Sequence, residues 1–319
     1  MAGPAPYAST LAADAARVTE LAAIASYAQI GRGDEKQADQ LAVDAMRTAL
    51  NNLDIDGKIV IGEGERDEAP MLYIGEKVGT GKGPAIDIAL DPLEGTTLTA
   101  KAMANALCVL SMSPGGGMLH APDTYMDKIA VGPGYPAGTV DLDNSPQDNV
   151  RNLAKAKGVP ASEITVCVMD RPRHAELIAA LREVGAKVVL ITDGDVAGVI
   201  HTAEPETGID MYLGSGGAPE GVLAASALKC VGGFFQGRLI FRNEDERERA
   251  RRTGVTDFDR KYDLHELVSK DAIFAATGVT KGAMLDGVQF RDGYVTTHTL
   301  VMDSSTRTVQ RIRTTRPVA

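Results

Sequence analysis

Two carboxylates three residues apart stand in the segment Asp91-Pro92-Leu93-Glu94-Gly95-Thr96-Thr97. The segment directly follows the apolar run 85–90, which we expect to be a buried strand. Hard divalent cations prefer carboxylate oxygens, and the glycine and hydroxyls that follow can face a phosphoryl oxygen. The spacing therefore indicates a metal and phosphate site. The simpler interpretation is a polar turn between a strand and a helix.

More carboxylates surround this segment. They are Glu63, Glu65, Asp67 and Glu68 after a predicted strand, and Asp34, Glu35 and Asp39 at the start of a predicted helix. An acidic loop is usually a solvated surface, but here glutamates interleaved with glycines come directly after the strand 58–61, and Glu63 is expected beside Asp91 at the sheet edge. Converging carboxylates cannot all stay ionised without cations, so we expect Mg²⁺ or Mn²⁺, as two ions about 3.5–4 Å apart. The residues alone do not choose between Asp34 and Asp39.

Other chemistries fit the chain poorly. The five histidines are scattered, so no cluster of His and Cys supports zinc. The sequence has no Gly-x-Ser-x-Gly elbow and no phosphate-binding Walker loop. No Gly-x-Gly-x-x-Gly motif opens a helix after a strand.

In the second half of the chain, polar clusters follow three predicted strands. The clusters are 170–173, 193–195 and 214–220. Strands alternate with helices here, which indicates a parallel sheet, and ligands bind at the carboxyl ends of such strands. Arg171 and Arg173 suit phosphate, whereas Asp193 and Asp195 suit sugar hydroxyls. The glycine run opening a helix favours an anion and directs Glu220 to the same mouth, although helix capping alone explains any single cluster.

The expected elements follow from hydrophobic periodicity and turn residues. Helices are expected at 10–30, 35–53, 145–157, 173–184, 195–202, 219–230 and 244–252. Strands are expected at 58–61, 85–90, 105–112, 125–131, 163–169, 186–191 and 209–213, and in the tail 290–312. A regular alternation of strands and helices begins near Gly158. We therefore predict an N-terminal α/β metal-site domain at 1–157 and a C-terminal α/β substrate domain at 158–319.

Composition limits the function classes. The 319 residues are 44% hydrophobic and 24% charged, and the net charge of −10 argues against nucleic-acid binding. The three cysteines lack metal-ligand spacing and sit in apolar runs, as free thiols do in a reducing cytosol. No run is long enough to span a membrane, and Met1 to Thr10 does not look like a signal peptide. We expect a cytoplasmic protein without membrane partners.

Several motifs resemble class II fructose-1,6-bisphosphatases, in the same order from about residue 10 to about residue 315. They are Gly31-Arg32-Gly33-Asp34, Ala38-Asp39, Ile59 to Glu65, Asp67 to Tyr73, Asp91 to Thr96, Arg171-Pro172-Arg173-His174, Asp193-Gly194-Asp195 and Gly216 to Gly221. The Asp91 to Thr96 motif alone indicates only the wider lithium-sensitive phosphatase superfamily, which includes inositol monophosphatases.

The resemblance implies a layered α-β-α-β-α sugar-phosphatase fold with two α/β halves. It also implies metal-dependent hydrolysis of the 1-phosphate of fructose 1,6-bisphosphate to fructose 6-phosphate, in gluconeogenesis or the Calvin cycle. The implied ligands of one metal are Asp39 and Glu63, and those of the other are Asp91, Glu94 and Glu220. The implied catalytic residues are Glu94 and Thr96, and the Thr96 hydroxyl helps to orient the attacking water. The implied substrate-binding residues are Glu94, Gly95, Thr96, Tyr125, Arg171, Pro172, Arg173, Asp193, Gly194, Asp195 and Gly217. Tyr125, and the choice of Asp39 over Asp34, rest on the resemblance alone.

The chain departs from the family pattern at two places. Glu35 stands where the family usually has lysine, and Lys36 comes one place later. On a helix that shift rotates the side chain by about 100°, which puts a lysine–phosphate contact in doubt. Ser215 stands where an apolar residue is expected, and it either adds a hydroxyl to the sugar site or caps the helix.

Alternative functions remain open. Some relatives also accept sedoheptulose 1,7-bisphosphate, and one carbon of difference in a sugar pocket is worth only about 1–3 kcal/mol. A non-catalytic sugar-phosphate-binding regulator on the same scaffold is a second alternative, and a nucleotide-dependent oxidoreductase is weaker. We expect a small-molecule sugar bisphosphate as the partner and a homo-oligomer, either a dimer or a tetramer.

Overall fold

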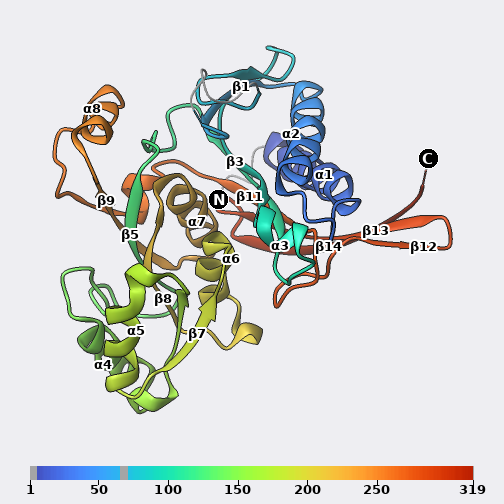
Figure 1. Ribbon diagram of the computed structural model, residues 1–319. Helices are drawn as coiled ribbons and strands as arrows, with labels where there is room; N and C mark the ends of the chain where they lie inside the picture. The colour runs from blue at the N-terminus through green and yellow to red at the C-terminus, as the bar shows by residue number, and fades with distance from the viewer. Residues whose placement is uncertain (1–5, 65–70, 319) are drawn as a thin grey trace. The chain divides into compact units, whose positions relative to one another are not determined.

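The computed structural model describes residues 6–64 and 71–318, and the chain divides into two compact units. Unit 1 comprises Met1–Leu119 and Val268–Ala319, and unit 2 comprises His120–Leu267. Each unit has its own sheet and its own helices, so the predicted α/β class is confirmed (Figure 1). The five-layer order of the sugar-phosphatase fold stays a prediction.

Unit 1 is built on a mixed sheet with the order β12-β13-β11-β4-β3-β1-β2, and β14 pairs with β13. The strands are β1 Asp56–Ile61, β2 Lys77–Val78, β3 Ala85–Glu94, β4 Leu107–Pro114, β11 Ile273–Gly278, β12 Gln289–Arg291, β13 Tyr294–Asp303 and β14 Thr308–Pro317. The helices are α1 Pro6–Tyr27, α2 Glu35–Asn51 and α3 Thr96–Ala100. Strands β1 and β3 run parallel, whereas β4 runs antiparallel to both β3 and β11.

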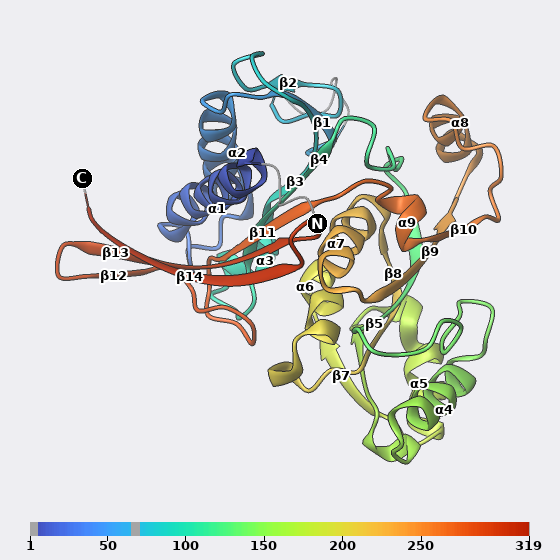
Figure 2. The same ribbon diagram turned by 180° about the vertical axis from the view of Figure 1, so that it is seen from behind.

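The alanine-rich helix α1 forms much of the core of unit 1. Ala15, Val18 and Ala22 are buried, and α1 contacts α2, β4, β11 and β13. Small side chains let the helix backbone approach the sheet closely, which favours dense packing. Figures 1 and 2 show α1 and α2 side by side against this sheet.

Unit 2 is built on a second mixed sheet with the order β10-β9-β5-β8-β6-β7. Its strands are β5 Tyr125–Val131, β6 Thr165–Met169, β7 Lys187–Ile191, β8 Met211–Gly217, β9 Phe234–Ile240 and β10 Lys261–Asp263. Its α-helices are α4 Pro146–Lys157, α5 Ala175–Glu183, α6 Asp195–Ile200, α7 Ala218–Val231, α8 Glu244–Arg252 and α9 Leu264–Leu267. Its short 3-10 helices are η1 Ala161–Glu163, η2 Pro172–His174, η3 His201–Ala203 and η4 Pro205–Thr207. In Figures 1 and 2, α4 and α5 lie on one side of this sheet, and α6 and α7 lie on the other.

The predicted parallel arrangement is confirmed for three strands of unit 2. Strand β6 pairs in parallel with both β7 and β8. The sheet as a whole is mixed, because β5 runs antiparallel to β8 and to β9. Strand β9 was not predicted, and neither was β11 of unit 1.

The two units do not follow the predicted domain ranges 1–157 and 158–319. Strand β5 and helix α4 lie in unit 2, because β5 pairs with β8 and β9. The last strands return to unit 1, where β11 pairs with β4 and β13 extends the same sheet. Unit 1 is therefore discontinuous in sequence, and unit 2 is inserted between its two segments.

Candidate functional site

The predicted metal ligand Glu63 follows β1, and the predicted ligand Asp91 lies near the end of its parallel neighbour β3. Ile61 at the end of β1 lies opposite Ala89 of β3, so each of the two carboxylates stands two residues beyond a paired position. Parallel neighbours end at the same edge of a sheet, so this register places Glu63 and Asp91 at one edge. The other predicted acidic residues of that loop, Glu65, Asp67 and Glu68, lie outside the described residues.

The backbone before Glu63 is fixed by close contacts. The Glu63 N–H donates to the Leu72 carbonyl at 3.0 Å, and a Cβ on Gly62 would lie 2.1 Å from that same oxygen, so only glycine fits. Leu72 in turn donates its N–H to the buried carboxylate of Glu76, which also accepts from Arg47 Nε on α2 at 2.7 Å. The residue beside the predicted ligand is thus tied to helix α2.

Strand β3 carries an irregularity between Asp91 and Glu94. Asp91 lies opposite Val109 and Glu94 opposite Leu107, so three steps on β3 match two steps on β4. Residues three apart on a regular strand face opposite sides, and one extra residue reverses that alternation. The bulge, which also accommodates Pro92, therefore lets both carboxylates face the same side.

The residues after the bulge begin a short helix. Gly95 has φ +91, a conformation that favours glycine, and Thr96 is the first residue of α3. Glu94 is only 5% exposed, and Asp91 Oδ1 accepts a hydrogen bond from the Leu93 N–H at 3.0 Å. The backbone thus brings the predicted catalytic residues Glu94 and Thr96 to one turn.

Asp39 and Asp34 have different surroundings. Asp34 is exposed and caps helix α2, accepting from the Gln37 N–H at 2.9 Å. Asp39 is half-buried on the same helix, and burial raises the pKa of its carboxyl. Burial, then Asp91, and more weakly Asp39 raise the pKa of the buried Cys108 thiol, so both carboxylates lie near this one thiol. These observations support Asp39 as the predicted ligand, and not Asp34.

The chemistry of this set of donors fits a hard cation. Asp39, Glu63, Asp91 and Glu94 offer only carboxylate oxygens, which Mg²⁺ and Mn²⁺ prefer. Within residues 6–64 and 71–318, however, no three His, Cys, Asp or Glu side chains are grouped closely enough to form a ready metal site. The loop 31–33 is held nearby, since Gly31 and Gly33 donate to carbonyls of α3.

In unit 2, two of the predicted clusters contact each other at the strand ends. After β6 and β7, Arg171 Nη2 lies 3.7 Å from Asp193 Oδ1. Pro172, after Arg171, starts η2, and Gly194, after Asp193 and at φ +82, precedes α6. The parallel order of β6 and β7 explains why the two clusters share one sheet edge.

The third cluster lies beside the first. Arg173 donates from Nε to Ser215 Oγ at 3.1 Å and from Nη2 to the Ser215 carbonyl at 2.7 Å. The Arg173 guanidinium also lies 5.0 Å from the centre of the Tyr125 ring, at cation–π distance. Tyr125 pairs with Gly217 across β5 and β8. The structure therefore brings the predicted residues Tyr125, Arg173 and Gly217 together.

A buried lysine lies among the predicted acidic residues of unit 2. The Lys128 side chain is 0% exposed, and its Nζ lies 2.5 Å from Asp195 Oδ2. Burial is the main cause that raises the pKa of the Glu220 carboxyl, with Lys128 opposing it and Asp195 adding to it. Glu220 Oε2 is buried and accepts no hydrogen bond within the described part of the chain. One cation thus faces two carboxylates.

Glycines make room for these carboxylates. A Cβ on Gly216 would lie 2.0 Å from Asp195 Oδ2, and a Cβ on Gly217 would lie 1.9 Å from Glu220 Oε2. The glycine run was predicted to expose backbone N–H groups to an anion. In the structure these glycines also leave the space that the acidic side chains of unit 2 occupy.

Sequence reasoning missed Lys128. The available signal was its place on β5, where Met126, Lys128 and Ala130 alternate with Asp127 and Ile129. Met126 and Ala130 are buried, so a lysine between them needs a buried anion as its partner. The alternation predicts the burial of the lysine but not which carboxylate lies opposite it.

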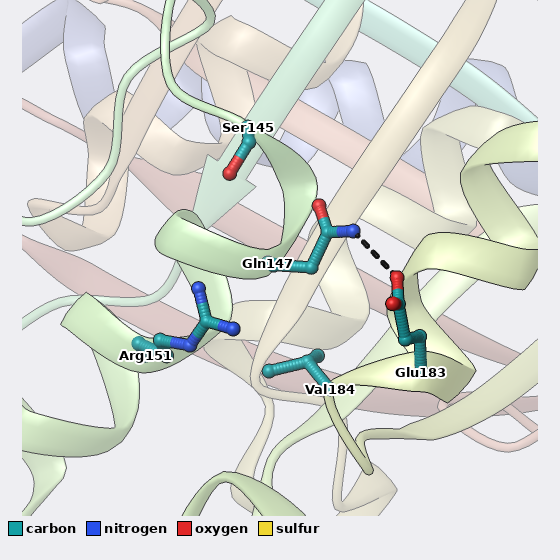
Figure 3. Close-up of a pocket in the computed structure, with 5 residues that line it drawn as sticks. All are labelled: Ser145, Gln147, Arg151, Glu183 and Val184. Atoms are coloured by element: carbon teal, nitrogen blue, oxygen red, sulfur yellow. Dashed lines mark hydrogen bonds between the residues drawn. The ribbon is translucent and has the colours of Figure 1, made fainter.

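A pocket elsewhere in unit 2 is not part of the predicted site. It lies between α4 and α5 and is lined by Ser145, Gln147, Arg151, Glu183 and Val184 (Figure 3). Gln147 donates to Glu183 at 3.0 Å, Ser145 caps α4, and Arg151 pairs with Asp148. These polar groups already have partners within the protein, and the lining includes none of the predicted site residues.

One known protein family matches almost the whole chain. The model of the bacterial fructose-1,6-bisphosphatase family, glpX-encoded, matches residues 9–316. The chain belongs to this family. No helix in the described residues is both long and apolar enough to cross a lipid bilayer.

Individual relatives match over nearly the whole chain. The chain is 48% identical over 316 residues to fructose-1,6-bisphosphatase 1 class 2 of Escherichia coli K12, which covers 95% of this chain and 94% of the relative. It is 46% identical over 322 residues to D-fructose 1,6-bisphosphatase class 2/sedoheptulose 1,7-bisphosphatase of Synechococcus sp. JA-3-3Ab, covering 93% and 92%. A solved inositol monophosphatase from Anabaena (Nostoc) sp. PCC 7120 matches at 12% identity over 60% of this chain and 71% of that one, with a TM-score of 0.31, which is too low to establish a common fold.

Proposed function

We propose that this chain hydrolyses the 1-phosphate of fructose 1,6-bisphosphate to fructose 6-phosphate and phosphate, with divalent metal as cofactor. The observation that carries the proposal is the 48% identity, over 316 residues, to a class 2 fructose-1,6-bisphosphatase. The position of Glu63 and Asp91 at one edge of the unit 1 sheet, and of the arginines at the strand ends of unit 2, supports it.

The proposed ligands of one metal are Asp39 and Glu63, and those of the other are Asp91, Glu94 and Glu220. When bound, Mg²⁺ or Mn²⁺ supplies Lewis acidity and offsets the charge of the phosphate. Burial raises the pKa values of Asp39 and Glu220, so each carboxylate is stabilised when a cation takes the place of its proton.

The proposed reaction is an in-line attack of water on the 1-phosphorus, without a covalent enzyme intermediate. The Thr96 hydroxyl orients this water, with Glu94 beside it, and the backbone of Gly95 and Thr96 holds the phosphoryl oxygens. The bond from phosphorus to the sugar oxygen breaks as the bond to water forms, and the attacking water loses a proton while the released sugar oxygen gains one. The proposed residues that bind the sugar and its distal phosphate are Tyr125, Arg171, Pro172, Arg173, Asp193, Gly194, Asp195 and Gly217.

Sedoheptulose 1,7-bisphosphate is the second proposed substrate. The relative from Synechococcus carries both activities in its name, at 46% identity to this chain. The two sugars differ by one carbon, and one such group changes transition-state binding by only about 1–3 kcal/mol. Activity on both sugars is therefore compatible with the same side chains.

A phosphate-release assay with Mn²⁺ or Mg²⁺ tests the proposal. The substrates are fructose 1,6-bisphosphate, sedoheptulose 1,7-bisphosphate and inositol monophosphate, and the variant is Glu94→Ala. We expect release from the first substrate and a fall in kcat of at least about a hundredfold in the variant, the size of loss seen when a catalytic electrostatic group is removed.

The matched control is Glu163→Ala, which removes an exposed carboxylate paired with Lys187 and should leave turnover unchanged. Full turnover in Glu94→Ala would reject the proposed site. Tight binding of the bisphosphate under saturating Mn²⁺ without any release would favour a non-catalytic regulator instead.

The proposal includes a cytoplasmic homo-oligomer, either a dimer or a tetramer. The free cysteines Cys108, Cys167 and Cys230 are all buried, which suits a reducing compartment. Light scattering after size-exclusion chromatography measures the oligomeric state directly, and a monomer at micromolar concentration would contradict this part.

A further inference from the structure

Ser215 occupies a position in β8 where its hydroxyl and its backbone are all engaged. The residue is 7% exposed, and the family pattern led us to expect an apolar side chain there. Two neighbours use its polar groups: Arg173 contacts Oγ and the carbonyl, and His174 contacts Oγ and the N–H. The position is thus a junction between η2 and β8.

The hydrogen bonds fix the direction of each donor. The Ser215 N–H donates to His174 Nε2 at 2.9 Å, so that nitrogen is an acceptor and the ring proton is on Nδ1. Nδ1 then donates to the Met169 carbonyl at 2.8 Å. Arginine has no acceptor, so Arg173 Nε donates to Ser215 Oγ. The hydroxyl proton is left to bond His174 Nε2, 3.1 Å away.

This arrangement holds the guanidinium of Arg173 as a carboxylate would. Two parallel donors, Nε and Nη2, meet two acceptors on one residue, the Oγ and the carbonyl of Ser215. Such a paired contact sets the plane of the guanidinium as well as its distance. The described residues offer no hydrogen-bond acceptor to the remaining N–H groups of Arg173, so they are available to an anion.

Of the two expectations for Ser215, the structure contradicts the helix cap, and the contact with the sugar stays a prediction. Helix α7 is capped by Gly217 without a side-chain bond, so Ser215 does not cap it. The hydroxyl accepts from Arg173 and donates to His174, so its proton and one of its two acceptor sites are used within the protein.

We propose that Ser215 is a positioning residue, which orients the Arg173 guanidinium toward the phosphate of the sugar bisphosphate that is not hydrolysed. The inference rests on the proposed function, because it needs Arg173 to bind that distal phosphate. An apolar residue at position 215 cannot play this role, because it has no side-chain oxygen to accept the hydrogen bond from Arg173 Nε.

The first test compares the wild type with Ser215→Ala on two substrates, fructose 1,6-bisphosphate and fructose 1-phosphate. The alanine keeps the backbone bonds to His174 and Arg173 Nη2 and loses the two bonds of the hydroxyl, to Arg173 Nε and to His174 Nε2. We expect KM for the bisphosphate to rise about five- to tenfold with kcat nearly constant, the effect of one hydrogen bond to a charged group. KM for the monophosphate, which lacks the distal phosphate, stays unchanged.

Ser226→Ala is the matched control, because Ser226 is also buried in unit 2 and, among the described residues, its hydroxyl bonds only the Leu223 carbonyl. Thermal melting of both variants reports whether they fold. An equal rise of KM for both substrates, or the same rise in the Ser226 variant, would overturn the inference.

A double-mutant cycle with Arg173→Met separates the inference from the proposed function. If Ser215 acts through Arg173, Ser215→Ala has no further effect on KM once Arg173 is replaced. If Arg173→Met raises KM for the bisphosphate but Ser215→Ala does not, the positioning role is wrong and the proposed function stands. If Arg173→Met leaves KM unchanged, the assignment of Arg173 in the proposed function fails.

Discussion

At the scale of single residues, Lys128 decides the charge balance of unit 2. Its ammonium is buried beside Asp195, and Glu220 is near enough for the lysine to counter the rise of that carboxyl's pKa. Two carboxylates in a buried environment are costly without a cation. Lys128 therefore balances the charge of two predicted site residues, Asp195 and Glu220, without a bound metal.

Lys128→Met should destabilise the protein by about 3–5 kcal/mol, because removing one partner leaves buried charge uncompensated. Urea unfolding at pH 7 measures the loss. The control is Lys187→Met, which removes the exposed partner of Glu163 and should cost less than about 1 kcal/mol. Equal losses in the two variants would show that Lys128 is not needed to balance the buried charges.

Single residues also show where sequence reasoning stops. The sequence located Asp91 and Glu94 from the apolar run before them, but it did not separate Asp34 from Asp39. That distinction depends on which carboxylate caps α2 and which is buried, and both follow from tertiary packing. Lys128 was missed for a related reason, since its partner Asp195 is 67 residues away in the chain.

At the scale of elements, the end of helix α6 carries a buried histidine. His201 is the C-cap of α6 and is 6% exposed, and its Nε2 finds no partner in the part of the chain that the structure describes. Burial lowers the pKa of this imidazole from 6.5 to about 4. The folded state therefore keeps His201 neutral where the unfolded chain takes up a proton.

We expect the free energy of unfolding to fall as the pH is lowered from about 6.5 to about 4. The unfolded state binds more protons in that window, so stability rises with pH through it and is fully present above it. His201 accounts for a fall of about 3 kcal/mol in the free energy of unfolding across this pH window, and His201→Met should abolish that part of the pH dependence.

Urea titrations at several pH values measure this slope. His265→Met, which removes an exposed imidazole from α9, controls for the loss of a histidine as such. An unchanged slope between pH 4 and 6.5 in the His201 variant would contradict the assignment.

Elements were easier to predict than their pairing. The cap Ser145, the following Pro146 and the left-handed Gly158 define α4 locally, so its bounds were readable from the sequence. Strand β9 was missed, although its residues alternate between buried and half-buried. Its antiparallel pairing with β5 joins residues more than a hundred positions apart, and local patterns do not specify such a register.

At the scale of the whole molecule, the chain leaves unit 1 and later returns to it. The sequence suggested a boundary near residue 158, where strands and helices begin to alternate regularly, but the structure divides the chain after residues 119 and 267. Local sequence patterns do not predict that the chain returns to unit 1, because β11 and β13 join a sheet that includes strands from before residue 119. The alternation that begins near residue 158 lies within unit 2 and does not mark a boundary between the units.

This division predicts which part of the chain folds alone. Residues 120–267 are continuous and include the whole β10-β9-β5-β8-β6-β7 sheet with the core that packs on it. A segment of about 150 residues buries enough surface for an independent domain. Residues 1–119 alone lack β11, β13 and β14, so β4 becomes an open edge and its buried side chains lose their cover.

The expected outcome is a cooperative urea transition for the fragment 120–267 and none for the fragment 1–119, both followed by far-ultraviolet circular dichroism. Joining 1–119 to 268–319 with a flexible linker should restore folding, because it brings β11 back beside β4. A fragment 120–267 without a cooperative transition would show that unit 2 depends on unit 1. A cooperative fragment 1–119 would show that the returning strands are dispensable for the core around α1, which their direct contacts with α1 argue against.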